Sequence, residues 1–388
     1  MVIAGLINMK NKINQELWKY TKINCFKKFN FDCNKKLVFN KTIDDNTKII
    51  KINNRTFTIS NINNTKITLT DLNYSSKKKL PFYDLFFNKI IQNNNNPFIN
   101  INKDNYINGL YLNVKDNTSL SNPIIIKSNA IKTNKDVMES ERFFLGIGKN
   151  VSGTIFIDEE ILSECNLNTV FELFIDENSN IDLIHFSDKP KTTQIFNFSS
   201  LINKNSNLNY IPIDLSGKLI KKNLDCTLKQ NSSCHFESLD MLNKNNYIDN
   251  FISINHYQKN TYSSTNQKNI LKNQATDIFY AKATILKDSV NSSAHQNNNN
   301  LMLSHKAKMY SNPQLEIYNN DVKCSHGSTT GDLDNDALFY MQSRGIKPSE
   351  CKKLILNGFA NQITDKIKND NIKKSINKKI KFWLDSDN

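Results

Sequence analysis

The 388-residue sequence predicts a mainly β chain with a mixed N-terminal region and a helical C-terminal region. Between residues 107 and 330, short apolar runs recur about every 8 to 12 residues, as at 153–157, 171–175 and 194–198, with Asn, Asp, Ser and Gly between them. Evenly spaced short strands are typical of a sandwich, a barrel or a β-helix, and periodicity alone does not choose among the three. From residue 334 onward the apolar residues are spaced three or four apart, which is the period of a helix.

Three regions follow from these signals: residues 1–106, 107–330 and 331–388. The first mixes helix and strand signals, and its segment 43–80 is so rich in Asn, Thr and Lys that we expect loops there. In the second region Asn is frequent between the apolar runs, and Asn tolerates the left-handed backbone conformation of tight turns. The Asn tract at 297–300 is therefore expected to form a corner between strands.

The third region carries helix start and stop signals. Asp334 is a good N-cap for a helix that ends near Arg344, Gly345 lies just past its end, and Pro348 opens a second helix. The apolar residues here repeat at helical spacing, and such a stripe is either a buried core face or a docking face. The two stripes are Leu354, Ile355, Phe359, Ile363 and Ile367, followed by Ile372, Ile376, Ile380, Trp383 and Leu384.

The net charge of +14, from 51 Lys and Arg against 37 Asp and Glu, raises the question of a nucleic-acid partner. About one residue in six is Asn, and Lys and Ile are also abundant, which is the signature of an AT-biased coding sequence. The basic residues lack the Gly and aromatic interleaving of an RNA-binding strand and the Cys and His spacing of a zinc finger. We therefore expect a solvated basic surface and no nucleic-acid partner.

The cysteines and the apolar runs bear on the compartment. Seven cysteines at irregular spacing in so long a chain do not form a disulfide scaffold, so they favour a reducing compartment. No apolar run approaches the roughly 18 residues of a membrane span. The N-terminus lacks the positive region and the small-residue cleavage site of a secretion signal. The sequence thus predicts a cytoplasmic protein without membrane association.

Cys324 and His326 form the most informative pair of side chains. Apolar residues alternate around them, so the segment is expected to be a strand on which Val322, Cys324 and His326 share one face. A thiolate and an imidazole side by side are suited to iron, zinc or copper. A complete iron–sulfur site needs about four ligands, so the missing ligands would come from elsewhere. A buried cysteine beside a hydrogen-bonded core histidine has the same spacing, and this reading stays open.

Other motifs are weaker. The chain has no phosphate-binding GxxxxGK[ST] loop, and the glycines at 146–148 lack the third Gly and the strand–helix context of a dinucleotide site. Cys226, Cys234 and His235 lie close in sequence but match no standard metal spacing.

The segment 313–346 reads PQLEIYNNDVKCSHGSTTGDLDNDALFYMQSRGI. It resembles the SufD family of iron–sulfur cluster assembly scaffolds, most clearly in the KCSHG core at 323–327 and the ALFYMQSRGI run at 337–346. The WKYT element at 18–21 is similar to one near the start of that family. The resemblance implies a right-handed parallel β-helix for residues 107–330, with an N-terminal α/β region and a C-terminal helical domain.

The resemblance also implies a non-enzymatic scaffold role in a SufB–SufC–SufD complex. His326, with Cys324 beside it, would contribute to a transient iron–sulfur cluster shared with SufB, whose β-helix would pair with this one. The C-terminal helices would dock the SufC ATPase, so that this chain itself would bind no nucleotide. The docking residues so implied are Leu338, Tyr340, Arg344, Leu354 and Phe359.

Two alternatives stay open on the sequence. One is a SufB-like paralogue, although SufB relatives carry a Gly-His-Glu core where this chain has KCSHG. The other is a parallel β-helix enzyme that acts on carbohydrates. Such an enzyme needs clustered carboxylates on one face of the helix, and the sequence shows none at a convincing spacing.

Overall fold

The computed structural model describes residues 15–26, 28–31, 39–44, 46–52, 55–62, 65–72, 80–91, 96–106, 108–130 and 135–386. The chain is mainly β, with 52% of its residues in strands and 18% in helices. Its central part is a β-solenoid of about seven turns, with helices near both ends. The parallel β-helix that the resemblance implies is confirmed.

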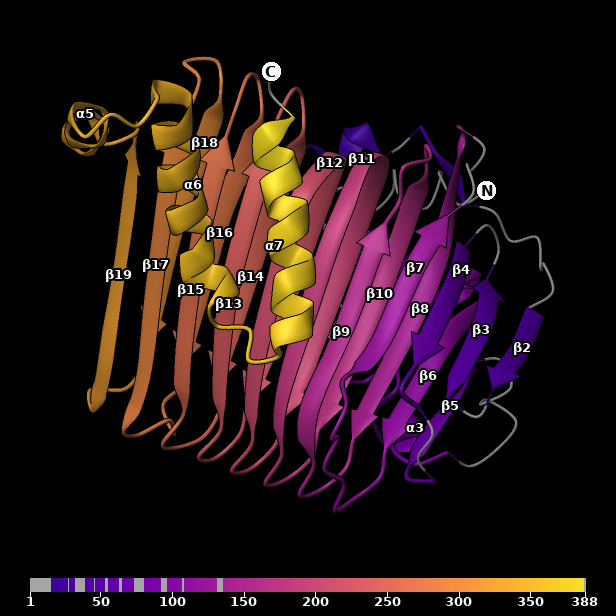
Figure 1. Cartoon of the computed structure of the whole chain (residues 1–388). Helices are drawn as coiled ribbons and strands as arrows, with labels where there is room; N and C mark the ends of the chain where they lie inside the picture. The colour runs from indigo at the N-terminus through magenta and orange to yellow at the C-terminus, as the bar shows by residue number, and fades with distance from the viewer. Residues whose placement is uncertain are drawn as a thin grey trace.

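The solenoid is built from strands that pair in parallel with the strands one turn away, so that they stack side by side in a long row (Figure 1). The row begins with β6 and β7 and ends with β18 and β19. Their bounds are Asn108–Val114 (β6), Ile124–Ala130 (β7), Val137–Ile147 (β8), Ser152–Glu160 (β9), Asn166–Ile175 (β10), Asn180–Ile202 (β11), Asn207–Leu228 (β12), Ser233–Leu242 (β13), Tyr247–His256 (β14), Tyr262–Leu271 (β15), Thr276–Ile285 (β16), Ser292–Met302 (β17), Lys308–Ile317 (β18) and Val322–Gly331 (β19).

Antiparallel strands extend the first turn of the solenoid. β2, β3 and β4 pair with one another and then with β7, while β5 pairs with β6. The prediction of loops over residues 43–80 is wrong for β3 to β5, because their polar residues alternate with apolar ones such as Phe57 and Ile59, which are buried against the core. These strands are Phe39–Asp44 (β2), Thr47–Ile52 (β3), Arg55–Ser60 (β4) and Ile67–Asp71 (β5).

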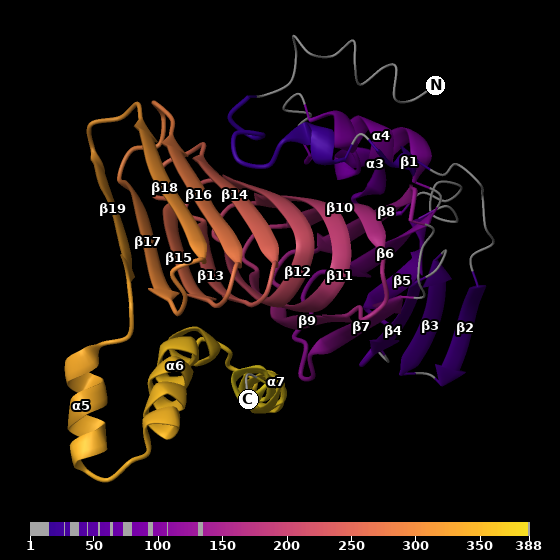
Figure 2. The ribbon, with the colours of Figure 1, turned by 90° about the horizontal axis from the view of Figure 1, so that it is seen from above.

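Short N-terminal elements lie on the outer face of the early turns (Figure 2). Three of them surround an aromatic cluster in which the ring centroids of Trp18 and Phe98 are 5.3 Å apart, whereas the short helix at residues 83–86 packs in a separate aromatic cluster. Asn96 caps α4 by accepting a hydrogen bond from the backbone of Phe98 at 3.1 Å. These elements are Ile23–Cys25 (η1), Asn30–Phe31 (β1), Tyr83–Phe86 (α3) and Pro97–Asn105 (α4).

One corner of the solenoid carries an asparagine in turn after turn, each with φ between 55 and 59°. Their side-chain amides bond across turns, as from Asn205 to Asn178 at 3.0 Å and from Asn231 to Asn205 at 2.8 Å. Asn is favoured here because it tolerates the left-handed conformation and also offers both a donor and an acceptor. The members of this Asn ladder are Asn117, Asn150, Asn178, Asn205, Asn231, Asn260 and Asn291.

The tract at 297–300 lies within β17 and not at a corner, so that prediction is wrong. Asn298 and Asn300 are buried in the solenoid interior, where Asn300 donates to Asn298 at 2.8 Å and accepts from Asn269 at 2.7 Å. Asn is stable inside these strands because stacked turns bring amides within hydrogen-bonding distance of one another.

The C-terminal helices begin and end where their capping signals predict. Asp334 accepts hydrogen bonds from the backbone of Asp336 and Ala337, Gly345 has φ of 85°, and Pro348 opens the next helix. Helices α6 and α7 lie against one outer face of the solenoid, and α5 is set off from it (Figure 2). The helices are Asn335–Ser343 (α5), Pro348–Thr364 (α6) and Asp370–Asp385 (α7).

The stripe on α7 forms a core face, because Ile372, Ile376, Ile380 and Leu384 are buried against the solenoid. The stripe expected on α6 is shifted. Its buried face starts from Cys351 and includes Ala360, whereas Leu354 is 53% exposed. The buried residues of α6 and of the loop that follows it are Cys351, Leu356, Ala360, Ile363, Thr364 and Ile367.

Candidate functional site

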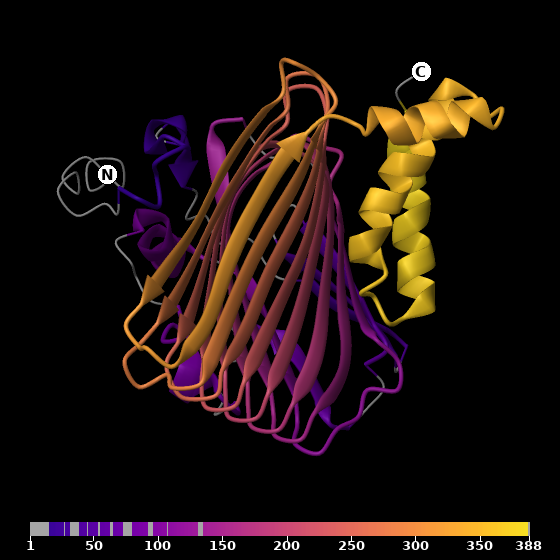
Figure 3. The same cartoon turned by 90° about the vertical axis from the view of Figure 1, so that its left-hand side faces the viewer.

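Cys324 and His326 lie on β19, the last strand of the solenoid. Among the described strands β19 pairs only with β17, so its other edge is open, and Figure 3 shows it at the near end of the stack. Cys324 is in register with Ala294, and His326 is in register with Gln296. Because both partners are buried and face the interior, the predicted shared face of Cys324 and His326 is the inner face, at the point where the interior opens.

The two side chains differ in exposure. Cys324 is half-buried and packs on the small apolar cluster of Ala283, Ile285 and Ala294. Burial raises the pKa of the Cys324 thiol, and a backbone hydrogen bond at Ala294 partly opposes this. A metal would therefore have to displace a proton from Cys324 in order to bind its sulfur. His326 is exposed and accessible to a partner.

A shallow polar hollow lies on the outer face of the strands at His326, opposite to the face that the His326 side chain shares with Cys324. It is bounded by strands β15, β17 and β19. His295 and Ser325, on neighbouring strands, are hydrogen-bonded there, with His295 Nδ1 2.8 Å from Ser325 Oγ. At Gly327 an added Cβ would meet only the Asn297 side chain, at 3.8 Å, so the outer surface of β19 is open at this position. The lining residues are Ser264, Thr265, Asn266, His295, Gln296, Asn297, Ser325, His326 and Gly327.

No group of three or more His, Cys, Asp or Glu side chains is arranged to hold a metal ion within the described part of the chain. Cys324 and His326 thus offer two of the roughly four ligands that an iron–sulfur site needs. The structure also separates the weaker candidates: Cys226 and Cys234 are buried in the interior, whereas His235 bonds Ser264 at 3.0 Å on the outer side of the strand. The hydrogen bond that the Cys226 thiol donates to Cys234, together with burial, raises the pKa of Cys226 well above its ordinary value, so the thiol stays protonated.

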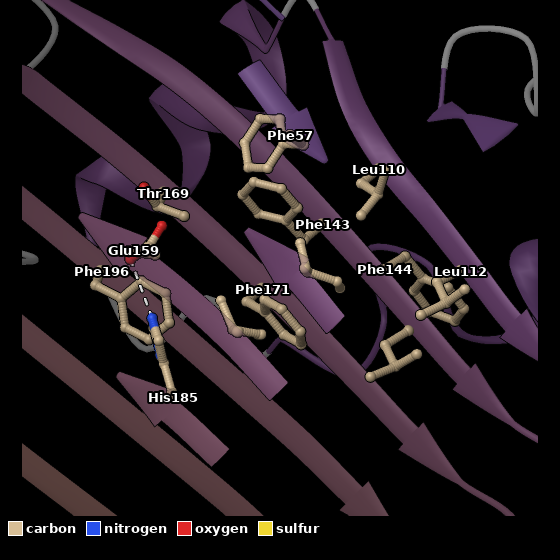
Figure 4. A pocket seen from close by; sticks show the side chains of 13 residues that line it. Phe57, Leu110, Leu112, Phe143, Phe144, Glu159, Thr169, Phe171, His185 and Phe196 are labelled. Carbon is tan, nitrogen blue, oxygen red and sulfur yellow. Dashed lines mark hydrogen bonds and ion pairs between the residues drawn. The ribbon is translucent and has the colours of Figure 1, made fainter. Parts of the chain in front are cut away.

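A second polar cluster lies inside the early turns, and sequence reasoning missed it because its members come from separate strands. Glu159 accepts a hydrogen bond from Lys189 at 2.7 Å and lies 3.0 Å from His185 Nε2 (Figure 4). The cavity next to it is otherwise lined by buried aromatic and aliphatic side chains. Since its charged groups pair with one another, we assign this cluster to the packing of the core.

The residues implied for docking lie on α5 and α6. Tyr340 is 60% exposed, and Arg344 stacks on its ring with the guanidinium 5.3 Å from the centroid. Leu338 is half-buried. Leu354 is exposed, whereas Phe359 packs against Lys268 of the solenoid, whose Nζ lies 4.2 Å from the ring. Sequence reasoning missed Phe339, which is 74% exposed on the same helix as Tyr340.

None of the described helices combines the length and the apolar character needed to span a bilayer.

Comparisons with known proteins identify the family of the chain. Residues 130–359, more than half of the chain, match the family model described as SUF system FeS cluster assembly, SufBD core domain. The chain therefore belongs to the SufBD family of iron–sulfur cluster assembly proteins. Its curated relatives confirm the resemblance to SufD.

The iron–sulfur cluster assembly protein SufD of Escherichia coli K12 is 30% identical, over 42% of this chain and 38% of the relative. A SufBD family protein of Synechocystis is 27% identical over 70% of this chain and 63% of the relative. The SufD protein of Plasmodium berghei is 22% identical over 55% of this chain and 16% of the relative. The matched part of this chain thus spans less than two thirds of each relative.

Proposed function

We propose that this chain is the SufD-type subunit of a SufB–SufC–SufD complex, in which it acts as a scaffold and not as an enzyme. Its open end pairs with the β-helix of SufB, and Cys324 and His326 contribute to a nascent iron–sulfur cluster completed by SufB side chains. The cluster is cargo, held for transfer. The C-terminal helices dock the SufC ATPase, and this chain binds no nucleotide itself.

One observation carries the proposal. The strand that holds the Cys-x-His pair is one of the two last strands of the solenoid, β18 and β19, each of which pairs with a single described strand and has an open outer edge. An open strand edge presents unpaired N–H and C=O groups that another strand can pair with. A partner bound there would bring its own side chains next to Cys324 and His326, and would supply the ligands that a four-ligand site still lacks.

The docking of the ATPase has separate support. Helix α5 presents Phe339 and Tyr340 to solvent at 74% and 60% exposure, and Leu354 of α6 is 53% exposed nearby in the chain. Exposed aromatic residues on a short, set-off helix are the kind of anchor that dominates protein interfaces.

The test is reconstitution of the purified three-component complex with ferrous iron and sulfide, followed by cluster absorbance. We expect His326→Ala to keep both partners and to lose most of the absorbance, because it removes a ligand or proton acceptor and no packing. His305→Ala, which changes an exposed histidine outside β19, is the matched control and should behave like the wild type. Cys324→Ser should have a milder effect, since the hydroxyl keeps the size while it weakens soft-metal affinity.

Wild-type absorbance in His326→Ala would refute the site assignment. Loss of SufB from the His326→Ala complex would instead show that His326 is needed for the pairing of this chain with SufB. For the second contact, Phe339→Ser with Tyr340→Ser should abolish capture of SufC while Phe382→Ser, on exposed α7 surface, should not. Equal capture by both variants would place the ATPase elsewhere.

A further inference from the structure

Two carboxylates meet inside the later turns of the solenoid. Asp240 of β13 and Asp277 of β16 are both fully buried. Asp240 Oδ2 accepts hydrogen bonds from Asn250 Nδ2 at 2.8 Å and Gln267 Nε2 at 3.3 Å. Asp277 Oδ1 accepts from the same Gln267 Nε2 at 3.4 Å. Each carboxylate therefore has one oxygen occupied.

The other two oxygens have no donor. Asp240 Oδ1 and Asp277 Oδ2 are both buried without a hydrogen-bond partner among the described residues, and so is Gln267 Oε1, which belongs to the side chain that joins the two acids. The two carboxyl groups lie close together, because both accept a hydrogen bond from the same Gln267 Nε2. Two bare carboxylate oxygens side by side in a dry interior repel each other, whereas one proton between them satisfies both.

Among the residues that the structure describes, the other charged groups that act on this pair are Lys222 and Asp214, both of β12. Lys222 is hydrogen-bonded to Asp214, so its charge is already matched. Three buried carboxylates thus share one cation, and ionising both Asp240 and Asp277 would leave two buried negative charges without a partner.

We propose that Asp240 and Asp277 form a buried acid pair that binds one shared proton in the folded chain. The site takes a proton and not a metal ion. No group of three or more His, Cys, Asp or Glu side chains in the described part of the chain is arranged to hold a metal ion, and the third carboxylate nearby, Asp214, is already paired with Lys222.

The pair is joined by hydrogen bonds to the open end. Gln267 Nε2 also donates to Asn269 Oδ1 at 3.0 Å, Asn269 donates to Asn300 at 2.7 Å, and Asn300 donates to Thr330 Oγ1 at 3.0 Å. Thr330 lies on β19, the strand of Cys324 and His326. Loss of the proton therefore destabilises the turns on which the open end rests.

The sign of the pH effect follows from the direction of the shifts. Burial, together with the charge of Asp214, raises the pKa of Asp240 to about 6, and burial with the charge of Asp240 raises that of Asp277. Folded-state pKa values above the unfolded ones mean that the folded chain holds more protons. Its stability is full at low pH and falls as pH rises from the unfolded value through the folded one.

The test compares wild type with Asp277→Asn, whose amide can donate to Asp240 Oδ1 in place of the shared proton. Between about pH 5 and pH 6, the unfolding equilibrium constant of the wild type should rise about tenfold more per pH unit than that of Asp277→Asn, because one more proton is released on unfolding. Asp104→Asn, which changes an exposed carboxyl on α4, should keep the wild-type slope.

A second measurement needs no unfolding. The folded chain with Asp225→Asn at pH 6 should show the infrared band of a buried protonated carboxyl, and adding Asp240→Asn or Asp277→Asn should remove it. Asp225 is replaced in this experiment because burial raises its pKa to about 6 as well. Equal pH slopes for wild type and Asp277→Asn, or absence of the band, would overturn the proposal. Stabilisation of wild type but not of Asp277→Asn by added Mg²⁺ or Ca²⁺ at constant ionic strength would also overturn it, since it would assign the two oxygens to a cation.

Discussion

Replacing Ile376 with Ala should weaken the packing of helix α7 on the solenoid. Ile376 is fully buried in the cluster that joins α6 and α7 to the outer face of the strands. The substitution removes about three methylene equivalents at ~0.8 kcal/mol each, or about 2.4 kcal/mol of transfer free energy. The cavity left behind adds to this, so we expect a loss of about 3 kcal/mol, within the range of roughly 2–5 kcal/mol found for buried Ile→Ala changes.

The assay is amide hydrogen exchange over residues 370–385, because an undocked helix of this length unwinds readily in water. A loss of about 3 kcal/mol corresponds to a rise of roughly 100-fold in the opening equilibrium and in the exchange rate of the α7 amides. Phe382→Ala is the matched control on the same helix, since Phe382 is 76% exposed and its removal should change stability by less than about 0.5 kcal/mol. Exchange in Ile376→Ala within threefold of the control would show that α7 is not held by this face.

Three further predictions concern stability and can be checked by denaturant unfolding. Asn205→Ala should lower stability by about 1–2 kcal/mol through left-handed strain and lost ladder bonds, and Asn205→Gly should cost less because it keeps the conformation at φ of 57°; equal losses would remove the strain argument. Burial raises the pKa of Asp225 to about 6, so the contribution of Asp225 to stability falls by about 3 kcal/mol as pH rises from about 4 to 6, and Asp225→Asn should make the slope of stability against pH more positive in this range. Burial lowers the pKa of His256 to about 4, so the contribution of His256 is lost as pH falls from about 6.5 to 4, and His256→Gln should make the slope more negative over the same range; a slope unchanged from the wild type in either variant would contradict the assignment.

Short-range patterns in the sequence correctly predicted where the C-terminal helices begin and end. The capping residues Asp334, Gly345 and Pro348 bound the helices as expected, because caps act within a few residues. The tract at 297–300 was predicted as a corner because Asn is common in turns, yet here it is held by amide bonds between turns that no local pattern reveals. The buried face of α6 differs from the predicted one for the same reason, because packing against the strands beneath the helix determines which of its residues are buried.

For the candidate site, alternation along one strand was enough to place Cys324 and His326 on the same face. Their position at the open end was not predictable from that pattern, since it depends on which strand is the last in the stack. The acid pair was even less accessible. Asp240 and Asp277 are 37 positions apart (277 minus 240) and meet only because the solenoid brings β13 and β16 to the same stretch of interior.

The packing of α6 and α7 also decides how the proposed docking of an ATPase can be tested. Removing residues 334–388 would uncover apolar side chains of the solenoid that these helices now cover, among them Phe156, Ile184 and Phe186. An exposed apolar patch of that kind promotes aggregation, so loss of capture by the truncated chain would not separate a missing contact from a damaged solenoid. Point changes on α5 avoid this, because Phe339 and Tyr340 are exposed and contribute nothing to the buried cluster. The proposed docking role is therefore tested with α5 variants in which hydrogen exchange of the α7 amides is as slow as in the wild type. Undiminished capture of the ATPase by such variants would refute it.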